Sequence, residues 1–227
     1  MIRRILTLLA ALALLPAFSA AADVIQLGDT PCLLQPAAEG DGGLRRYVLF
    51  TGDGDYFHAV QNCRDMTALD GLLLIPQGDS SYINYSSASD VVIADLFPAL
   101  RAWAGDGYEM ILIGYSAGGY PATVLAASLA EAGYTGRLIL LDGIYGNYRG
   151  VAYNEDYYRA SLSTWQVTIY ASSEKGYPPI SDRTQRVGAA LADDEFVTYH
   201  RYAMSHNEMR MFYRVFLAGA EAPEPVE

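Results

Sequence analysis

One serine has the sequence surroundings of a nucleophile held on a sharp turn. Residues 114–118 read Gly-Tyr-Ser-Ala-Gly, with Ser116 at the centre. An apolar run at 110–113 precedes them, and an alanine-rich stretch at 121–132 follows. This pattern predicts a strand, a tight turn and a helix, with the serine hydroxyl raised above the sheet and glycines where a Cβ would collide. It favours covalent catalysis, although a turn of small residues that only packs a helix onto a sheet would have the same sequence pattern.

A serine hydroxyl needs a base within hydrogen-bond reach, and that base needs a carboxylate to orient it. The chain has three histidines. His58 follows a turn on an expected helix, His200 lies in an apolar strand, and His206 lies in a short polar turn before the last helix. A structural role is the simplest interpretation of His200, because an imidazole in an apolar strand is usually satisfied by its neighbours.

The elements around these residues alternate between strands and helices. Strands are expected at 46–50, 72–75, 110–113, 137–141, 166–170 and 196–200. Helices are expected at 59–69, 90–104, 121–132, 181–192 and 207–217. Alternating units with continuously apolar strands predict an α/β fold, with a mostly parallel sheet and helices on both of its faces.

From residue 45 to 219, this arrangement resembles the α/β-hydrolase fold, and residues 111–142 look most like its small esterases and thioesterase domains. The resemblance implies the chain order nucleophile, acid, histidine, and it places the histidine in the late loop, at His206. Thioesterase-like relatives place the acid where Asp142 stands, at the end of the strand 137–141. Most other members place it after the next strand, where Glu174 stands, and Asp182 is a third candidate.

The resemblance also implies an oxyanion hole made of two backbone N–H groups. Ala117, directly after the nucleophile, supplies one of them in the family. The second comes from the turn after an early strand, so that Asp53 or Gly54 would donate it here. Relatives commonly begin this turn with His-Gly, whereas this chain has Thr51 and Gly52. A plain turn without a donor role is the alternative.

The chain contains eighteen tyrosines, which concentrate around the expected site. They could line an amphipathic pocket for an aromatic acyl group, a sugar ester or a peptide, or they could simply pack the loops. The insertion after Asp142 is only about 20 residues long, which predicts a minimal lid. The tyrosines expected at a substrate pocket are Tyr82, Tyr85, Tyr115, Tyr145 and Tyr148.

The first 22 residues have the organisation of a secretory signal peptide: two arginines, an apolar stretch, and Ala-Ala-Ala before Asp23. We therefore expect an exported protein, periplasmic or secreted, without a stable membrane anchor after cleavage; a retained N-terminal anchor is the alternative. The mature domain would cover 23–219, followed by a disordered Pro/Glu-rich tail at 220–227. The net charge of −11 disfavours nucleic acids and anionic membranes as partners.

In an oxidising compartment the only two cysteines, Cys32 and Cys63, are expected to form a disulfide, with two buried thiols as the alternative. Neither has a Cys or His partner at ligand spacing, so we expect no metal and no other cofactor. Taken together, the residues predict an exported serine hydrolase that cleaves an ester or thioester-like bond of a small or polymeric acyl substrate. A peptide, amide or cell-wall hydrolase on the same residues and a non-catalytic binding protein are the alternatives.

Overall fold

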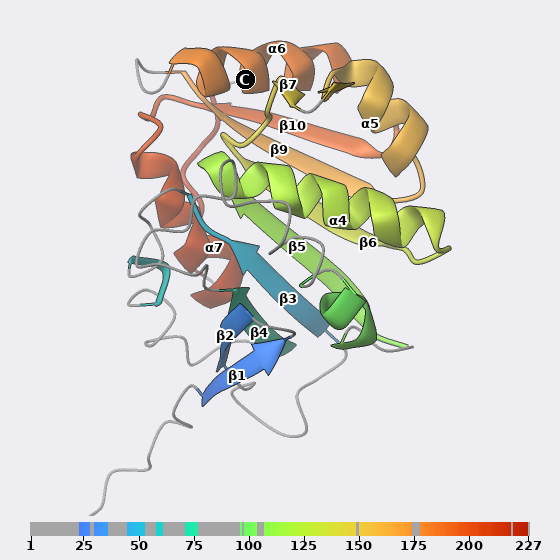
Figure 1. Cartoon of the computed structure of the whole chain (residues 1–227). Coiled ribbons are helices and arrows are strands. Elements are labelled where there is room, and N and C mark those ends of the chain that lie inside the picture. The colour runs from blue at the N-terminus through green and yellow to red at the C-terminus, as the bar shows by residue number, and fades with distance from the viewer. Residues whose placement is uncertain are drawn as a thin grey trace, which may run out of the picture.

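In the part of the chain that the structure describes, one mixed sheet of eight strands is accompanied by a separate two-stranded hairpin (Figure 1). The computed structural model describes residues 23–27, 30–35, 45–52, 58–60, 71–76, 96, 98–103, 107–148, 150–173, 178–218 and 220–226. The large sheet has the order β1-β2-β4-β3-β5-β6-β9-β10, and the hairpin pairs β7 with β8.

The strands and helices have the following bounds. The strands are β1 Asp23–Leu27, β2 Thr30–Gln35, β3 Arg45–Phe50, β4 Gly71–Pro76, β5 Glu109–Tyr115, β6 Gly136–Leu141, β7 Asn147–Tyr148, β8 Val151–Ala152, β9 Gln166–Ser172 and β10 Val197–Tyr202. The helices are α4 Gly119–Glu131, α5 Glu155–Leu162, α6 Pro178–Leu191 and α7 Phe212–Ala218, with short 3-10 turns η1 Ser116–Gly118 and η2 Glu208–Met211.

The six strands from β4 to β10 run parallel to their neighbours, and β1 and β2 add an antiparallel edge beside β4. The predicted mostly parallel sheet is therefore confirmed. Parallel strands pack apolar side chains on both faces, which is why β5 is buried over six consecutive residues from Met110 to Tyr115. The antiparallel pair β1–β2 was not predicted, because its short sequence has no strong alternation of apolar and polar residues.

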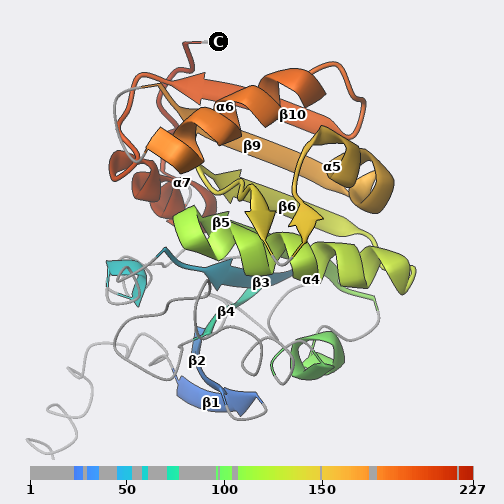
Figure 2. The same cartoon turned by 45° about the horizontal axis from the view of Figure 1, so that its top comes forward.

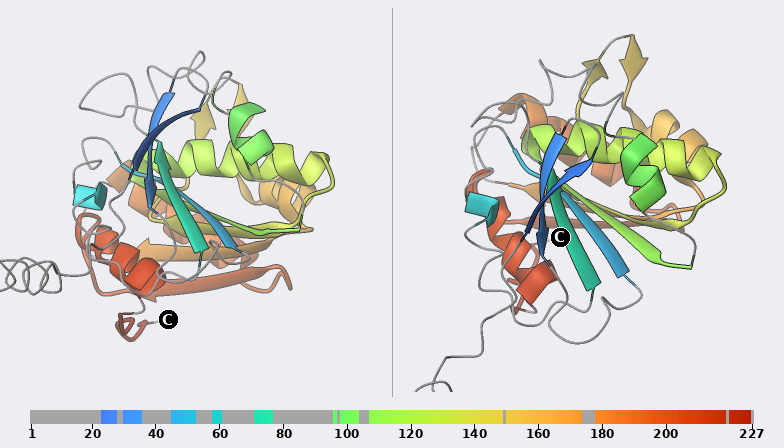
Figure 3. Two further views of the ribbon diagram at one scale, coloured as in Figure 1. Left: turned by 90° about the horizontal axis from the view of Figure 1, so that it is seen from below. Right: turned by 60° about the horizontal axis from the view of Figure 1, so that its bottom comes forward.

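Helices cover both faces of the sheet, as predicted. On β9, Ile169 lies beside Gly188 of α6, whereas the ring of the next residue, Tyr170, packs at an angle against the rings of Phe212 and Phe216 in α7. Successive strand residues point to opposite faces, so α6 and α7 lie on opposite sides of the sheet. Figures 2 and 3 show α4, α5 and α6 together on one side, with α7 on the other.

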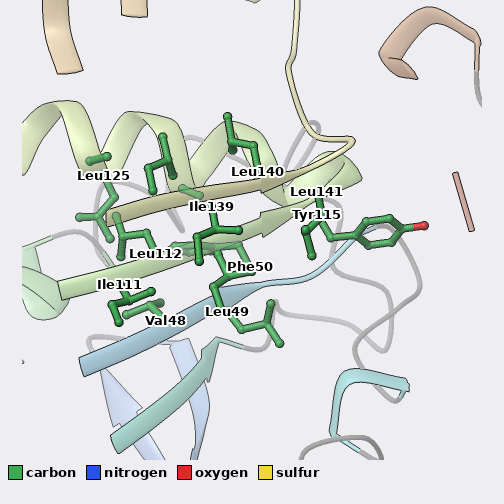
Figure 4. Close-up of a cluster of buried hydrophobic side chains, with 14 of the residues drawn as sticks. Val48, Leu49, Phe50, Ile111, Leu112, Tyr115, Leu125, Ile139, Leu140 and Leu141 are labelled. Atoms are coloured by element: carbon green, nitrogen blue, oxygen red, sulfur yellow. The ribbon is translucent and has the colours of Figure 1, made fainter. Parts of the chain in front are cut away.

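The core lies where β3, β5 and β6 meet helix α4. Figure 4 shows buried side chains of the three strands packed together, with Leu125 of the helix above them. Burying each such side chain stabilises the fold by roughly 1.5–3 kcal/mol relative to exposure. The labelled core residues are Val48, Leu49, Phe50, Ile111, Leu112, Tyr115, Leu125, Ile139, Leu140 and Leu141.

The helices have sequence-encoded ends. At the end of α4, Gly133 adopts φ +86°, and the N–H of Tyr134 donates to the carbonyl of Leu129, which is a Schellman cap. Helix α5 is capped by Asn154, whose side-chain oxygen accepts the N–H of Tyr157.

In its described residues, the connection between β6 and β9 contains the β7–β8 hairpin and the eight-residue helix α5, in agreement with a minimal lid. Residues 220–226 have no regular secondary structure, and the N–H of Val226 donates to the carbonyl of Arg201 in the edge strand β10. The expected signal peptide, 1–22, lies outside the described residues. Within the described part, no helix is both long and apolar enough to cross a membrane.

Candidate active site

Ser116 stands at the junction of β5 and η1 in a left-handed conformation, with φ 50°. Such a conformation is costly for a residue with a Cβ and persists only where the surrounding fold imposes it. Here the fold does so because η1 and α4 approach the sheet closely. A Cβ on Gly118 would overlap the backbone of Phe50, and one on Gly119 would overlap the carbonyl oxygen of Gly143. The glycines therefore permit the turn that carries Ser116.

His206 lies between Ser116 and Asp142. Its Nε2 is 2.8 Å from the Oγ of Ser116, and its Nδ1 is 2.7 Å from the Oδ2 of Asp142. The carboxylate accepts hydrogen bonds only, so Nδ1 carries a proton and donates it, which leaves Nε2 of the neutral ring to accept the serine hydroxyl. The side chain of His206 is 8% exposed and that of Asp142 0%. This arrangement matches a nucleophile, its base and an orienting acid.

Asp142 follows β6 and is itself strained, with φ 47°. Ser116 and Asp142 are the two non-glycine residues with positive φ in the described part of the chain. Besides His206, two buried hydroxyls donate to Asp142 Oδ2: Ser172 at 2.6 Å and Ser181 at 2.5 Å. The N–H of Ser172 donates to Oδ1 at 3.3 Å. These donors offset the cost of burying an ionised carboxylate and fix its rotamer.

The turn that carries His206 is held from two sides. The Tyr115 hydroxyl donates to the carbonyl of His206 at 3.0 Å, and its ring stacks on the imidazole with centroids 5.1 Å apart. On the other side, the N–H and hydroxyl of Ser205 both donate to Glu208 Oε2, at 2.8 and 2.7 Å. These two hydrogen bonds lower the pKa of Glu208. The imidazole is therefore placed by contacts to its own backbone as well as to its ring.

The described part of the expected oxyanion hole lies beside Ser116. Ala117 is buried in the first turn of η1, where backbone N–H groups have no partner within the helix. A Cβ on Gly52 would be 3.1 Å from the Cβ of Ser116 and 2.9 Å from the Tyr115 ring, so this turn passes directly over the serine. Asp53 and Gly54, the two expected second donors, lie outside the described residues.

The other two histidines are not hydrogen-bonded to Ser116. His200 is half-buried on β10, with its ring 5.3 Å from that of Tyr170 and 6.2 Å from that of Tyr202. His58 is exposed and lines a surface pocket behind the His206 turn. Among the alternative acids, Asp182 is exposed on α6, and Glu174 lies outside the described residues. Of the described candidates, the structure brings Asp142 to His206.

The tyrosines expected at a substrate pocket have different surroundings. Tyr115 is 4% exposed and supports the His206 turn, so its ring packs rather than opening into a cavity. Tyr145 is half-buried, with its ring 6.2 Å from that of Tyr120 at the start of α4. Tyr148 belongs to strand β7. Tyr82 and Tyr85 lie outside the described residues.

Sequence reasoning did not identify Ser172 and Ser181 as partners of the carboxylate. Isolated serines carry no sequence signal for such a contact, because their meeting depends on how α6 packs against β9. The Ser205–Glu208 contact did have a signal, since Ser-x-x-Glu is the pattern of a capping box. Cys32 is fully buried on β2, whereas Cys63 lies outside the described residues, so their disulfide stays a prediction. No group of three metal-ligating side chains occurs among the described residues.

Comparisons with known proteins relate the chain to others through its structure alone. No protein-family model matches it, and no curated protein matches its sequence. DphMB1 superposes with a TM-score of 0.62 at 15% identity, covering 92% of this chain and 85% of its own. A thermostable esterase from Pseudomonas putida superposes with a TM-score of 0.56 at 14% identity, covering 90% of this chain and 80% of its own. TT1662 from Thermus thermophilus superposes with a TM-score of 0.57 at 16% identity, covering 87% of this chain and 95% of its own. The sheet order, the strained serine turn and these superpositions together identify the fold of this chain as that of the α/β-hydrolases.

Proposed function

We propose that this protein is a serine hydrolase that cleaves an ester or thioester-like acyl bond through an acyl-enzyme. One observation carries the proposal: two contacts, 2.8 and 2.7 Å long, connect Ser116 through His206 to Asp142. A structural role alone does not require a strained serine, a nearly buried imidazole and a buried carboxylate to lie in series. Strained backbone of this kind concentrates at functional sites, which further favours catalysis.

In the proposed mechanism, Ser116 Oγ attacks the acyl carbonyl while His206 Nε2 takes the hydroxyl proton. Asp142 holds the Nδ1 proton in place and stabilises the imidazolium that forms. The same Nε2–H then protonates the leaving alcohol or thiol, which departs as the acyl-enzyme forms. Water, deprotonated by His206, attacks this intermediate and releases the acid, and Ser116 regains its proton.

The negative oxygen of the tetrahedral intermediate would be bound by the N–H of Ala117 and by a donor from the turn that begins at Gly52. Each such donor is typically worth about 3–4 kcal/mol of transition-state stabilisation. The proximity of Gly52 to Ser116 supports this placement. The Pseudomonas putida relative is an esterase, which supports ester hydrolysis as the first activity to test.

The proposal is tested with p-nitrophenyl esters of graded acyl length on the wild type and on acid variants. Asp142→Asn is isosteric but removes the orienting charge, so kcat should fall by about 10³–10⁴-fold. Glu174→Gln is the matched control and should keep kcat within a few-fold of the wild type. The opposite pattern would assign the acid to Glu174. A folded wild type that hydrolyses none of the esters would refute an esterase, and hydrolysis of short p-nitroanilides alone would favour the amide hydrolase.

We further propose that the protein is exported and that residues 1–22 are removed. Expression of the full chain in a Gram-negative host, followed by N-terminal sequencing of the periplasmic product, should give Asp23 as the first residue. Thiol titration of this product in denaturant should detect no free thiol if Cys32 and Cys63 are paired. Retention of Met1, or two titrating thiols, would contradict the corresponding prediction.

A further inference from the structure

A polar pocket lies between the connection that follows Asp142 and helix α6. Its volume is about 380 Å³. Strand β7 contributes Asn147 to its lining, and helix α6 contributes the two arginines. The pocket is lined by Gly146, Asn147, Tyr153, Asn154, Arg183 and Arg186. None of these residues takes part in the proposed chemistry, although the pocket begins four residues after Asp142 in the chain.

The pocket brings two positive charges together in an acidic protein. The chain has 15 basic and 26 acidic residues, yet Arg183 and Arg186 form no ion pair with any residue that the structure describes. By contrast, Arg159 on the neighbouring helix α5 pairs with Asp194 at 3.0 Å. Two arginines three residues apart lie on the same face of a helix. The exposed Asp182 lines the adjacent hollow together with Arg186, without an ion pair between them.

One close approach and two hydrogen bonds connect the walls of the pocket. The Arg183 guanidinium rests on the backbone of Gly146, where a Cβ would come within 2.6 Å of Nη2 and 2.7 Å of Nε. Below this contact, the N–H of Ile144 donates to Thr184 Oγ1 at 3.1 Å, which ties the connection to α6. The two sides of the β7–β8 hairpin are joined by the N–H of Tyr153, which donates to the carbonyl of Gly146 at 3.1 Å.

The remaining polar groups complement the arginines. The side-chain oxygen of Asn154 already accepts the N–H of Tyr157, so its amide N–H groups are left to donate. Two guanidinium groups and an amide in one pocket supply hydrogen-bond donors without a carboxylate among the lining residues. Arginine's planar fork is suited to the paired oxygens of a carboxylate or a phosphate.

We propose that Arg183 and Arg186 form a binding site for a carboxylate or phosphate group. The same helix α6 carries Ser181, whose hydroxyl donates to Asp142, so that a ligand here contacts the element that orients the proposed acid. The anionic group is either part of the acyl substrate or a separate small anion. Binding itself does not depend on the proposed function, whereas the substrate origin of the anion rests on it.

Binding is tested on the full chain carrying Ser116→Ala, a substitution that prevents hydrolysis. This protein is titrated with inorganic phosphate and with succinate in a calorimeter. At least one probe should bind saturably, and Arg183→Gln/Arg186→Gln should weaken its affinity about tenfold or more. Binding should also weaken as sodium chloride is raised. Arg159→Gln is the matched control, because its arginine is already paired, and it should bind as the parent does. Absence of saturable binding of either probe, or equal affinity in the double variant, would overturn the site. Circular dichroism of each variant establishes that the fold is kept.

The source of the anion is tested kinetically with the active chain. The probes are the p-nitrophenyl monoester of succinic acid, which carries a free carboxylate, and the neutral p-nitrophenyl butyrate. If the group belongs to the substrate, the ratio of kcat/KM for the charged ester to that for the neutral ester falls about tenfold in the double variant. If the ratio stays constant while phosphate binding is lost, the site binds a separate anion. Failure of the wild type to hydrolyse either ester counts against the proposed function and leaves the calorimetric result standing.

Discussion

The hydrogen bonds to the Asp142 carboxylate predict how much stability the protein loses when their donors are removed. Ser172 and Ser181 each donate a hydroxyl to its Oδ2, at 2.6 and 2.5 Å, and both are almost fully buried. Hydrogen bonds to charged groups contribute about 1.5–3 kcal/mol each. Ser172→Ala and Ser181→Ala should therefore each lower the free energy of unfolding by roughly that amount at neutral pH. Because the two hydroxyls share one acceptor, the double variant should lose less than the sum of the two.

The same substitutions should affect turnover more than substrate binding. Without one hydroxyl, the carboxylate is held less firmly and orients His206 less well, so kcat falls while KM changes little. Stability is measured by urea unfolding and kinetics with a p-nitrophenyl ester. Ser163→Ala, at the exposed end of α5, is the control and should stay within about 0.5 kcal/mol of the wild type. If both single variants kept the stability and kcat of the wild type, the two hydroxyls would have no role in holding the carboxylate.

Three further predictions concern the elements around the site. Gly119→Ala places a methyl group against the Gly143 carbonyl oxygen, and should lower the free energy of unfolding by about 1–3 kcal/mol, measured by urea unfolding; no loss would contradict the close approach. Glu208→Gln weakens the hydrogen bonds to Ser205 and should lower kcat/KM for a p-nitrophenyl ester by less than about tenfold. Because these hydrogen bonds lower the pKa of Glu208, the difference in kcat/KM between variant and wild type should shrink only at acidic pH, where Glu208 becomes protonated in the wild type. Burial, with Tyr202 nearby, raises the pKa of Tyr170 to about 12, above about 10 in the unfolded chain. The neutral Tyr170 side chain therefore stabilises the folded state fully below pH 10, and this stabilisation is lost as the pH rises towards 12. The wild type should lose free energy of unfolding between pH 9 and pH 11, measured by urea titration, and Tyr170→Phe should lose less.

The parallel strands of the sheet and helices α4 and α6 were predictable because their signals are local. The apolar run at 110–113, the glycines around Ser116 and the alanine-rich helix determine the β5–α4 unit, and the structure confirms that unit within about two residues. Helix α5 was not predicted. Its N-cap, Asn154, lies in a tyrosine-rich segment whose helical pattern is only two turns long. Short elements of this kind depend on tertiary packing more than on propensity.

The candidate site was predictable to the extent that chain order constrains it. A late histidine and an acid at a strand end can be recognised without coordinates, and the structure places His206 and Asp142 in contact. The choice between Asp142 and Glu174 was open in sequence, because both follow strands at the same edge of the sheet. Ser181 was not recognisable, since it meets the carboxylate only when α6 packs across β9. The close approach of the Arg183 side chain to Gly146 depends on the same packing.

The proposed function depends most on whether Ser116 is a nucleophile that His206 activates. A fluorophosphonate probe, incubated with the folded protein and located by peptide mass spectrometry, reports this chemistry without any choice of substrate. We predict a single adduct on Ser116, none in Ser116→Ala, and labelling slowed by about 10³-fold or more in His206→Ala. Labelling at equal rates in wild type and His206→Ala, or a folded wild-type protein that is never labelled at Ser116, would contradict the account.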